Sequence, residues 1–176
     1  MRSLISTGDL YGVNFCYHKV PEELDIFDEE AFYRSPMEFY VVCTDIHTGK
    51  PVYHKCDQGM KADMEWIRAS ASMPLVSRIV RVEGHELLDG GIADSIPLRY
   101  FEKLGYERNV VILTQPKGYI KKENELLPLM KVVFHKYPKL IRAMAERHEI
   151  YNKTTRYIQM RERRGAAFVI RPETPL

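Results

Sequence analysis

Several sequence features are scarce or missing in this 176-residue chain, and each absence narrows its class. No run approaches 18 consecutive apolar residues, which argues against a helix that spans a bilayer. The first eight residues are too few and too polar for a secretory signal. The three cysteines, Cys16, Cys43 and Cys56, are an odd number without a framework spacing, which is typical of reduced thiols. We therefore expect a single cytoplasmic domain over residues 1–176.

Acidic residues are scarce in one region, although the net charge of the whole chain is only +2. Residues 117–164 hold thirteen Lys or Arg against five Asp or Glu. Such a basic region favours contact with an anionic membrane surface, while a solvated helical face is the more ordinary explanation. No nucleic-acid-binding module accompanies the charge, so we expect no nucleic-acid partner.

The hydrophobic pattern alternates between strands and helices, which indicates an α/β fold. Aromatic and β-branched residues predict a central strand over 37–45. The continuous apolar run 109–114 predicts a strand that is buried on both faces. The other expected elements are a helix at 28–34, a strand at 51–55, a helix at 61–73, a hairpin of 78–82 with 85–88, two or three helices within 123–164, and a strand at 167–170.

The most constrained stretch is Asp89-Gly90-Gly91, directly after the predicted hairpin. Paired glycines permit backbone angles and close approaches that side chains forbid. A carboxylate fixed beside such a turn is a candidate general base, although Asp also closes turns by bonding to its own backbone. Asp94 or Ser95 is expected to cap the helix that follows.

Two further groups of residues are candidate sites. Four soft metal ligands lie within fourteen residues, but no pair has the close spacing of a zinc site, so we expect no metal and no cofactor; they are Cys43, His47, His54 and Cys56. A Ser72–His85–Asp89 triad can also be written. However, Ser70 and Ser72 lie on a predicted helix of small residues, and His85 lies beside a turn. We expect these serines to serve close helix packing.

The residues from Ala69-Ser70-Ala71-Ser72-Met73-Pro74-Leu75 to Leu88-Asp89-Gly90-Gly91, with Pro97, resemble the second half of a bacterial patatin-like phospholipase domain. Shorter stretches resemble one branch of that family, at 8–12, 21–25, 44–49, 113–119 and 147–152. The resemblance implies a three-layer α/β/α fold and a lipid acyl hydrolase with a Ser-Asp dyad. Asp89 would take the serine proton, and Gly90 and Gly91 would form the active-site turn.

The same resemblance implies a serine in a G-x-S-x-G elbow and a glycine-rich oxyanion loop, and this sequence contains neither. We therefore expect an incomplete, C-terminal part of the domain that is inactive by itself. The absent strands are expected to leave a sheet edge and an apolar face uncovered, which favours self-association. The substrate would be a lipid ester or phospholipid, met at the inner face of the membrane. The alternative is a non-catalytic membrane-docking or protein-interaction module with a basic helical face.

Overall fold

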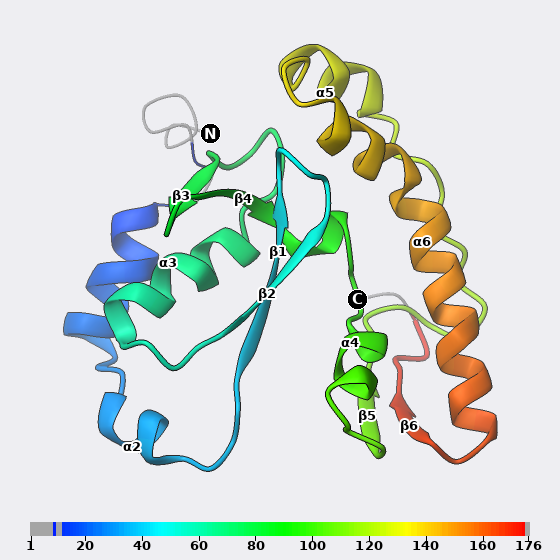
Figure 1. Cartoon of the computed structure of the whole chain (residues 1–176), viewed down its shortest axis with the longest axis horizontal. Helices are drawn as coiled ribbons and strands as arrows, with labels where there is room; N and C mark the ends of the chain where they lie inside the picture. Colours follow the sequence, from blue (N-terminus) through cyan, green and yellow to red (C-terminus); the bar gives the residue numbers. More distant parts are fainter. Residues whose placement is uncertain (1–8, 10–11, 175–176) are drawn as a thin grey trace.

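A computed structural model of the chain describes residue 9 and residues 12–174 (Figure 1). Within these residues the strands form an antiparallel sheet of order β2-β1-β4-β3 and a separate parallel pair, β5-β6. The strands are β1 (Tyr40–Asp45), β2 (Pro51–Lys55), β3 (Val80–Val82), β4 (His85–Asp89), β5 (Asn109–Ile112) and β6 (Ala167–Ile170). The predicted α/β class is confirmed, and residues 8–12 of the resemblance lie mostly outside the described part.

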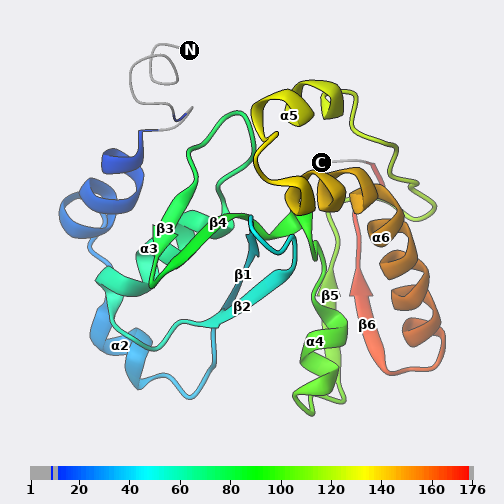
Figure 2. The same cartoon turned by 45° about the horizontal axis from the view of Figure 1, so that its top comes forward.

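Helices pack on both sheets (Figures 1 and 2). The helix α3 covers the larger sheet with Trp66 and Ala69, while the long helix α6 runs beside β5 and β6. None of the helices in the described ranges combines the length and apolar content that crossing a bilayer demands. The helices are η1 (Phe15–Leu24), α2 (Glu29–Arg34), α3 (Met60–Ser70), η2 (Gly90–Ile92), α4 (Leu98–Lys103), α5 (Leu127–Val133) and α6 (Pro138–Arg163).

Most predicted elements of the larger sheet are confirmed. The strand β1 is an inner strand, as its aromatic and β-branched residues predict. The hairpin β3–β4 reverses at Glu83 and Gly84, which both have positive φ, at 49° and 80°. A two-residue turn with two positive φ angles matches the twist of the strands. Asp89 is the last residue of β4, the second strand of this hairpin.

The prediction of a strand at 109–114 buried on both faces is wrong. Only Val111 of β5 is buried, and Val110 and Ile112 are 65% and 72% exposed. The reason is that β5 pairs with β6 alone, and Ile158 of α6 covers one side of the pair. The open side carries an apolar face made of Val110, Ile112, Phe168 and Ile170. Self-association through this β5–β6 face stays a prediction.

Two helix boundaries also differ from the prediction. The helix α3 ends at Ser70 rather than at residue 73. Helix α4 begins after Pro97, and neither Asp94 nor Ser95 caps it, because both side chains have other partners. The Asp94 carboxylate accepts a hydrogen bond from the Tyr53 hydroxyl at 2.7 Å, and the Ser95 hydroxyl donates to the carbonyl oxygen of Gly91 at 2.8 Å.

The central hydrophobic core joins the larger sheet to the C-terminal helices. Ile46, which follows β1, and Leu88 of β4 are fully buried against Leu140 of α6. The turn between β1 and β2 approaches the same helix so closely that a Cβ on Gly49 would lie 2.4 Å from the carbonyl oxygen of Lys139. Gly49 also has a φ of +65°, so only glycine fits there without strain.

Candidate active site

The backbone of Asp89 is held from two sides at the end of β4. Its N–H donates to the carbonyl oxygen of Ser72 at 2.8 Å. Its own carbonyl accepts from the hydroxyl of Thr44, a fully buried residue of β1, also at 2.8 Å. The Thr44 hydroxyl accepts in turn from the N–H of Ala93, beyond the turn, at 3.2 Å. The position of Asp89 is therefore set by the segment just after α3, by β1 and by the residues that follow Asp89.

The carboxylate of Asp89 is half-buried and keeps one oxygen available. Its Oδ1 accepts from the N–H of Gly91 at 2.6 Å, whereas no hydrogen bond within the described residues occupies Oδ2. Burial raises the pKa of Asp89, although the Gly91 N–H and the charge of Arg147 partly oppose this. A carboxylate with a raised pKa is a better general base than an ordinary one.

Close approach, rather than an unusual φ, explains the two glycines of the turn. Neither has a positive φ. A Cβ on Gly90 would lie 2.0 Å from the carbonyl oxygen of Val42, which is impossible without moving the backbone. A Cβ on Gly91 would lie 2.8 Å from Asp89 Oδ1. Gly90 thus lets the turn lie against β1, and Gly91 leaves room for the carboxylate.

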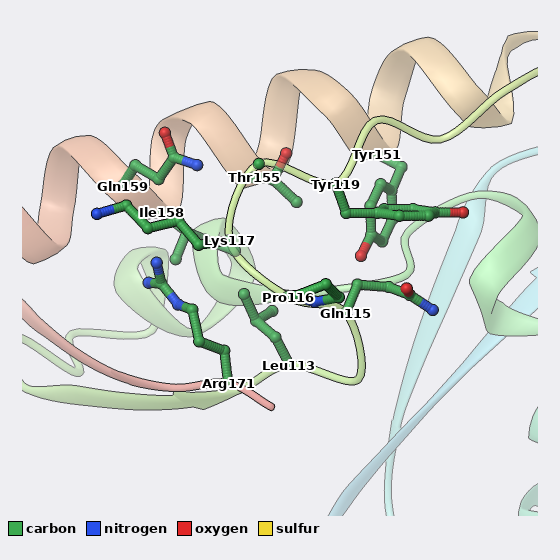
Figure 3. Close-up of a pocket in the computed structure, with 11 residues that line it drawn as sticks. Leu113, Gln115, Pro116, Lys117, Tyr119, Tyr151, Thr155, Ile158, Gln159 and Arg171 are labelled. Carbon is green, nitrogen blue, oxygen red and sulfur yellow. The ribbon is translucent and has the colours of Figure 1, made fainter. Parts of the chain in front are cut away.

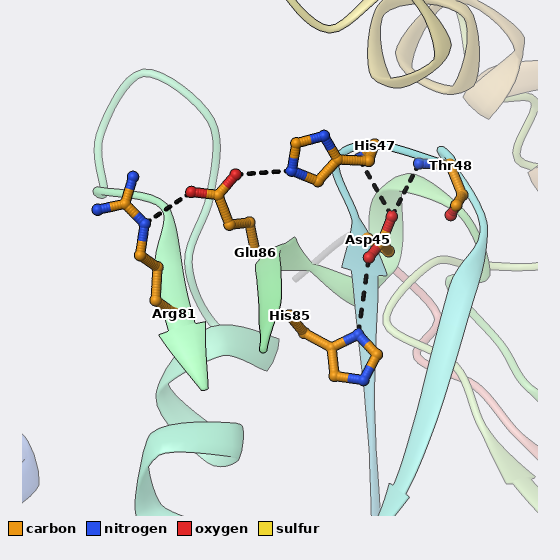
Figure 4. A network of polar contacts seen from close by, with 6 residues as sticks. All are labelled: Asp45, His47, Thr48, Arg81, His85 and Glu86. Atoms are coloured by element: carbon orange, nitrogen blue, oxygen red, sulfur yellow. Dashed lines mark hydrogen bonds and ion pairs between the residues drawn. The ribbon is translucent and has the colours of Figure 1, made fainter. Parts of the chain in front are cut away.

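The serines and histidine of the alternative triad do not converge on Asp89. The Ser72 hydroxyl donates to the carbonyl of Arg68 at 2.8 Å, and the Ser70 hydroxyl donates to that of Val42 at 2.7 Å. His85 faces Asp45 instead, with Nδ1 3.7 Å from the carboxylate (Figure 4). The packing role expected for both serines agrees with these contacts.

Figure 4 shows that His47 and His85 belong to a polar network that connects the β1–β2 turn with the β3–β4 hairpin. The Asp45 carboxylate accepts from the backbone N–H groups of His47 and Thr48, at 3.1 and 2.8 Å. The Glu86 carboxylate contacts the His47 ring at 2.7 Å and accepts from Arg81 at 2.6 Å. These bonds fix the β1–β2 turn and need no catalytic role for His47.

The four possible metal ligands between residues 43 and 56 do not form one cluster. His54 and Cys56 instead meet Asp63 of α3, with their ligand atoms within 4.8 Å of one another and all three residues buried. Asp63 contacts His54 at 3.0 Å through Oδ1, and its Oδ2 accepts from Tyr33 at 2.7 Å. Burial raises the pKa of the Cys56 thiol to about 12, and the His54 ring stacks on Trp66 with the ring centroids 4.2 Å apart. We assign this cluster a structural role.

A cavity of about 270 Å³ adjoins the Asp-Gly-Gly turn. Its lining includes Gly91, Lys121, Arg147 and Tyr151. The neighbouring cavity in Figure 3 lies between residues 113–119 and α6, and it measures about 20 Å³. That volume suits about one water molecule, so only the larger cavity has room for part of a substrate.

Two family models match parts of this chain, and one of them covers the turn. Residues 25–102, which contain Asp89, Gly90 and Gly91, match the model of the patatin-like phospholipase family. This segment is patatin-like. The match indicates that the segment belongs to a protein of the lipid hydrolase type. Residues 137–176 match a second family model, a domain of unknown function (DUF6363), and no curated protein matches the chain.

The patatin-like segment and the DUF6363 segment meet at the turn. Arg147 of α6 donates from Nε to the carbonyl oxygen of Gly91 at 2.6 Å. That carbonyl also accepts from Ser95, so it carries one hydrogen bond from within the patatin-like segment and one from α6. Sequence reasoning found Asp89 but not Arg147 or Thr44 as residues that hold it. The signal was present only as the unexplained stretches 147–152 and 44–49 of the family resemblance.

Proposed function

We propose that this chain supplies the general base of a lipid acyl-ester hydrolase, with Asp89 as the aspartate of a Ser-Asp dyad. The observation that carries the proposal is the carboxylate itself. It is half-buried, has a raised pKa, is fixed by β1 and the Gly90-Gly91 turn, and keeps Oδ2 available inside a patatin-like segment. Ser70, Ser72 and Ser95 each donate to a backbone carbonyl and not to this carboxylate, so the proposed dyad takes its nucleophilic serine from another segment.

The proposed reaction follows from the position of that oxygen. Asp89 Oδ2 takes the proton as the serine oxygen attacks the ester carbonyl and forms a tetrahedral intermediate. The C–O bond to the alcohol then breaks, and the leaving oxygen takes the proton from Asp89. Water attacks the resulting acyl-serine, giving its proton to Asp89, and the serine leaves with that proton as the fatty acid is released. Asp89 thus performs both proton transfers that a histidine performs in a triad.

The absence of a positioned serine is directly testable. A fluorophosphonate probe, which reacts with activated serines, is expected to leave this chain unlabelled, and the chain alone should not hydrolyse a short p-nitrophenyl ester above background. The probe should label a single serine once the nucleophile-bearing segment is supplied. Labelling of the chain alone that disappears in Ser72→Ala would contradict the proposal and revive the triad.

The alternative proposal is peripheral docking on an anionic membrane, and one surface favours it. Helix α5 lies at one extremity of the molecule (Figure 1) and leaves large apolar side chains in solvent. Exposed lysines at 131, 136 and 139 surround them. Apolar side chains rimmed by lysines are typical of an interfacial helix at the inner membrane face. This α5 patch consists of Leu126, Leu129, Val132 and Val133.

Replacing Leu129 and Val132 together by glutamate is expected to weaken binding to anionic vesicles at least about tenfold, since each apolar side chain that enters the interface contributes on the order of 1 kcal/mol or more. Cosedimentation with vesicles of phosphatidylglycerol and phosphatidylcholine measures this. Val110→Glu changes an equally exposed apolar residue away from α5 and should bind like the wild type. Equal binding to neutral and anionic vesicles would eliminate docking through this patch.

A further inference from the structure

The charged side chains that line the cavity beside the Asp-Gly-Gly turn are all positive. Lys121 and Arg147 both line it, and none of its other described lining residues is acidic. The hydroxyls of Ser95 and Thr114 and the amide of Gln115 complete its polar wall. Neither Lys121 nor Arg147 forms a salt bridge within the residues that the structure describes. Two cations therefore share one cavity whose described lining holds no acidic residue, although the Asp89 carboxylate lies near enough to feel the charge of Arg147.

Both cations are held in place by contacts that leave hydrogen-bond donors available. Arg147 binds the Gly91 carbonyl through Nε, and no hydrogen bond of the described chain uses its two terminal nitrogens. The backbone of Lys121 is clamped by the side chain of Asn152, which accepts from its N–H and donates to its carbonyl, both at 2.9 Å. The ammonium group lies 4.8 Å from the centre of the Tyr151 ring. The charged ends thus stay available for a ligand.

These contacts come from one stretch of α6. Arg147 and Tyr151 are four residues apart and both line the cavity, and Asn152, at the next position, reaches the backbone of Lys121. Tyr151 is also among the labelled residues in Figure 3, where its ring lies beside that of Tyr119. The stretch 147–152, which the proposed reaction leaves without a role, acquires one as the wall that positions two cations.

The arrangement has an energetic cost that an anion would remove. Burial lowers the pKa of Lys121, and the nearby charge of Arg147 lowers it further. Like charges brought together in a half-buried site are unfavourable unless a negative group lies between them. A guanidinium fork with an ammonium group is the donor set that binds the oxygens of a phosphate.

We propose that Lys121 and Arg147 form a subsite for a phosphate group beside Asp89. The inference rests on the proposed function, because it makes the hydrolase selective for phosphate-bearing lipid esters. The volume of about 270 Å³ suits a phosphate with a small headgroup better than an acyl chain. The same chemistry would also accept free phosphate, so the test compares both sources.

Binding requires no nucleophile, so the chain itself serves for the test. Calorimetric titration compares inorganic phosphate, dihexanoyl phosphatidic acid and neutral dihexanoylglycerol. Lys121→Gln is expected to weaken binding of the two phosphate ligands about tenfold, a typical effect of removing one charge-assisted hydrogen bond. Lys122→Gln, which changes the exposed neighbour, should bind like the wild type. Tighter binding of phosphatidic acid assigns the subsite to a lipid headgroup, and equal or tighter binding of phosphate assigns it to the free ion.

Two results would overturn the subsite. One is an unchanged affinity in Lys121→Gln, and the other is equal binding of neutral dihexanoylglycerol and phosphatidic acid. Arg147→Lys, which keeps the charge but loses the planar fork, should also bind more weakly. Amide spectra of each variant verify that the fold is intact. Asp89→Asn should bind phosphate at least as well as the wild type because it removes a nearby negative charge. A failure of the subsite is thus distinguishable from a failure of the base.

Discussion

Asp89→Asn is expected to lower kcat for ester hydrolysis about a thousandfold in a protein that combines this chain with its nucleophilic serine, as loss of a general base does. The substitution is nearly isosteric. The asparagine oxygen still accepts the Gly91 N–H that Oδ1 accepts at 2.6 Å, but it takes no proton from a serine. Steady-state kinetics with a short-chain ester measure the loss, and unchanged turnover would refute the base role.

The pH dependence of the same reaction has a definite sign. Asp89 works as a base only when ionised, and burial raises its pKa. We therefore expect kcat/KM to fall as pH decreases through this raised pKa, earlier than for an ordinary aspartate. A profile that stays flat down to the usual aspartate range would contradict this.

Folding stability should change with pH in the opposite direction to activity, because ionised Asp89 favours activity but disfavours the folded state. Because the pKa of Asp89 is higher in the folded than in the unfolded chain, its ionisation costs folding stability as pH rises between the two values, and the cost persists at neutral pH. Asp89→Asn removes that cost, so its melting temperature at pH 7 should equal or exceed that of the wild type. Loss of activity together with retained stability separates a catalytic defect from unfolding.

Gly90→Ala is expected to destabilise the chain by about 3 kcal/mol, at the upper end of the cost of overpacking a core. The added Cβ would lie 2.0 Å from the Val42 carbonyl oxygen and 2.9 Å from the Val42 Cβ. Either the turn leaves β1 or the β1–β4 pairing opens, and both changes displace Asp89. Urea unfolding followed by circular dichroism measures the difference.

Gly12→Ala provides the matched control, because its new methyl group would make only an ordinary 3.6 Å contact with Phe15 and its φ is not positive. This variant should unfold within about 0.5 kcal/mol of the wild type, as surface substitutions usually do. If Gly90→Ala were equally stable, the turn would not lie against β1 as described.

Local chemistry made the larger sheet predictable. The β-branched run of β1 and the tight turn between β3 and β4 both depend on neighbouring residues alone. The burial of β5 was not predictable in this way. An apolar run indicates a strand, but which of its faces is covered depends on partners more than forty residues away, here β6 and Ile158 of α6.

The same distinction applies to the site. Asp89 and its glycines were recognisable because they are contiguous. Arg147 lies 56 residues from the Gly91 that it contacts, and Lys121 lies 31 residues from Asn152. Asp94 shows the opposite case. Its residue type and position predicted a helix cap, but its carboxylate accepts a hydrogen bond from the distant Tyr53 hydroxyl instead. Side chains with long-range partners were invisible to spacing arguments.

The contact between Gly49 and the backbone of Lys139 bears on how this protein diversifies. It joins the patatin-like segment to a helix that a separate family model covers, through atoms that no side-chain substitution can replace. Ile46 and Leu140 share one core across the same boundary. The two segments are thus shaped to each other: in a hybrid with α6 taken from a different protein, that helix would meet a turn shaped for another backbone.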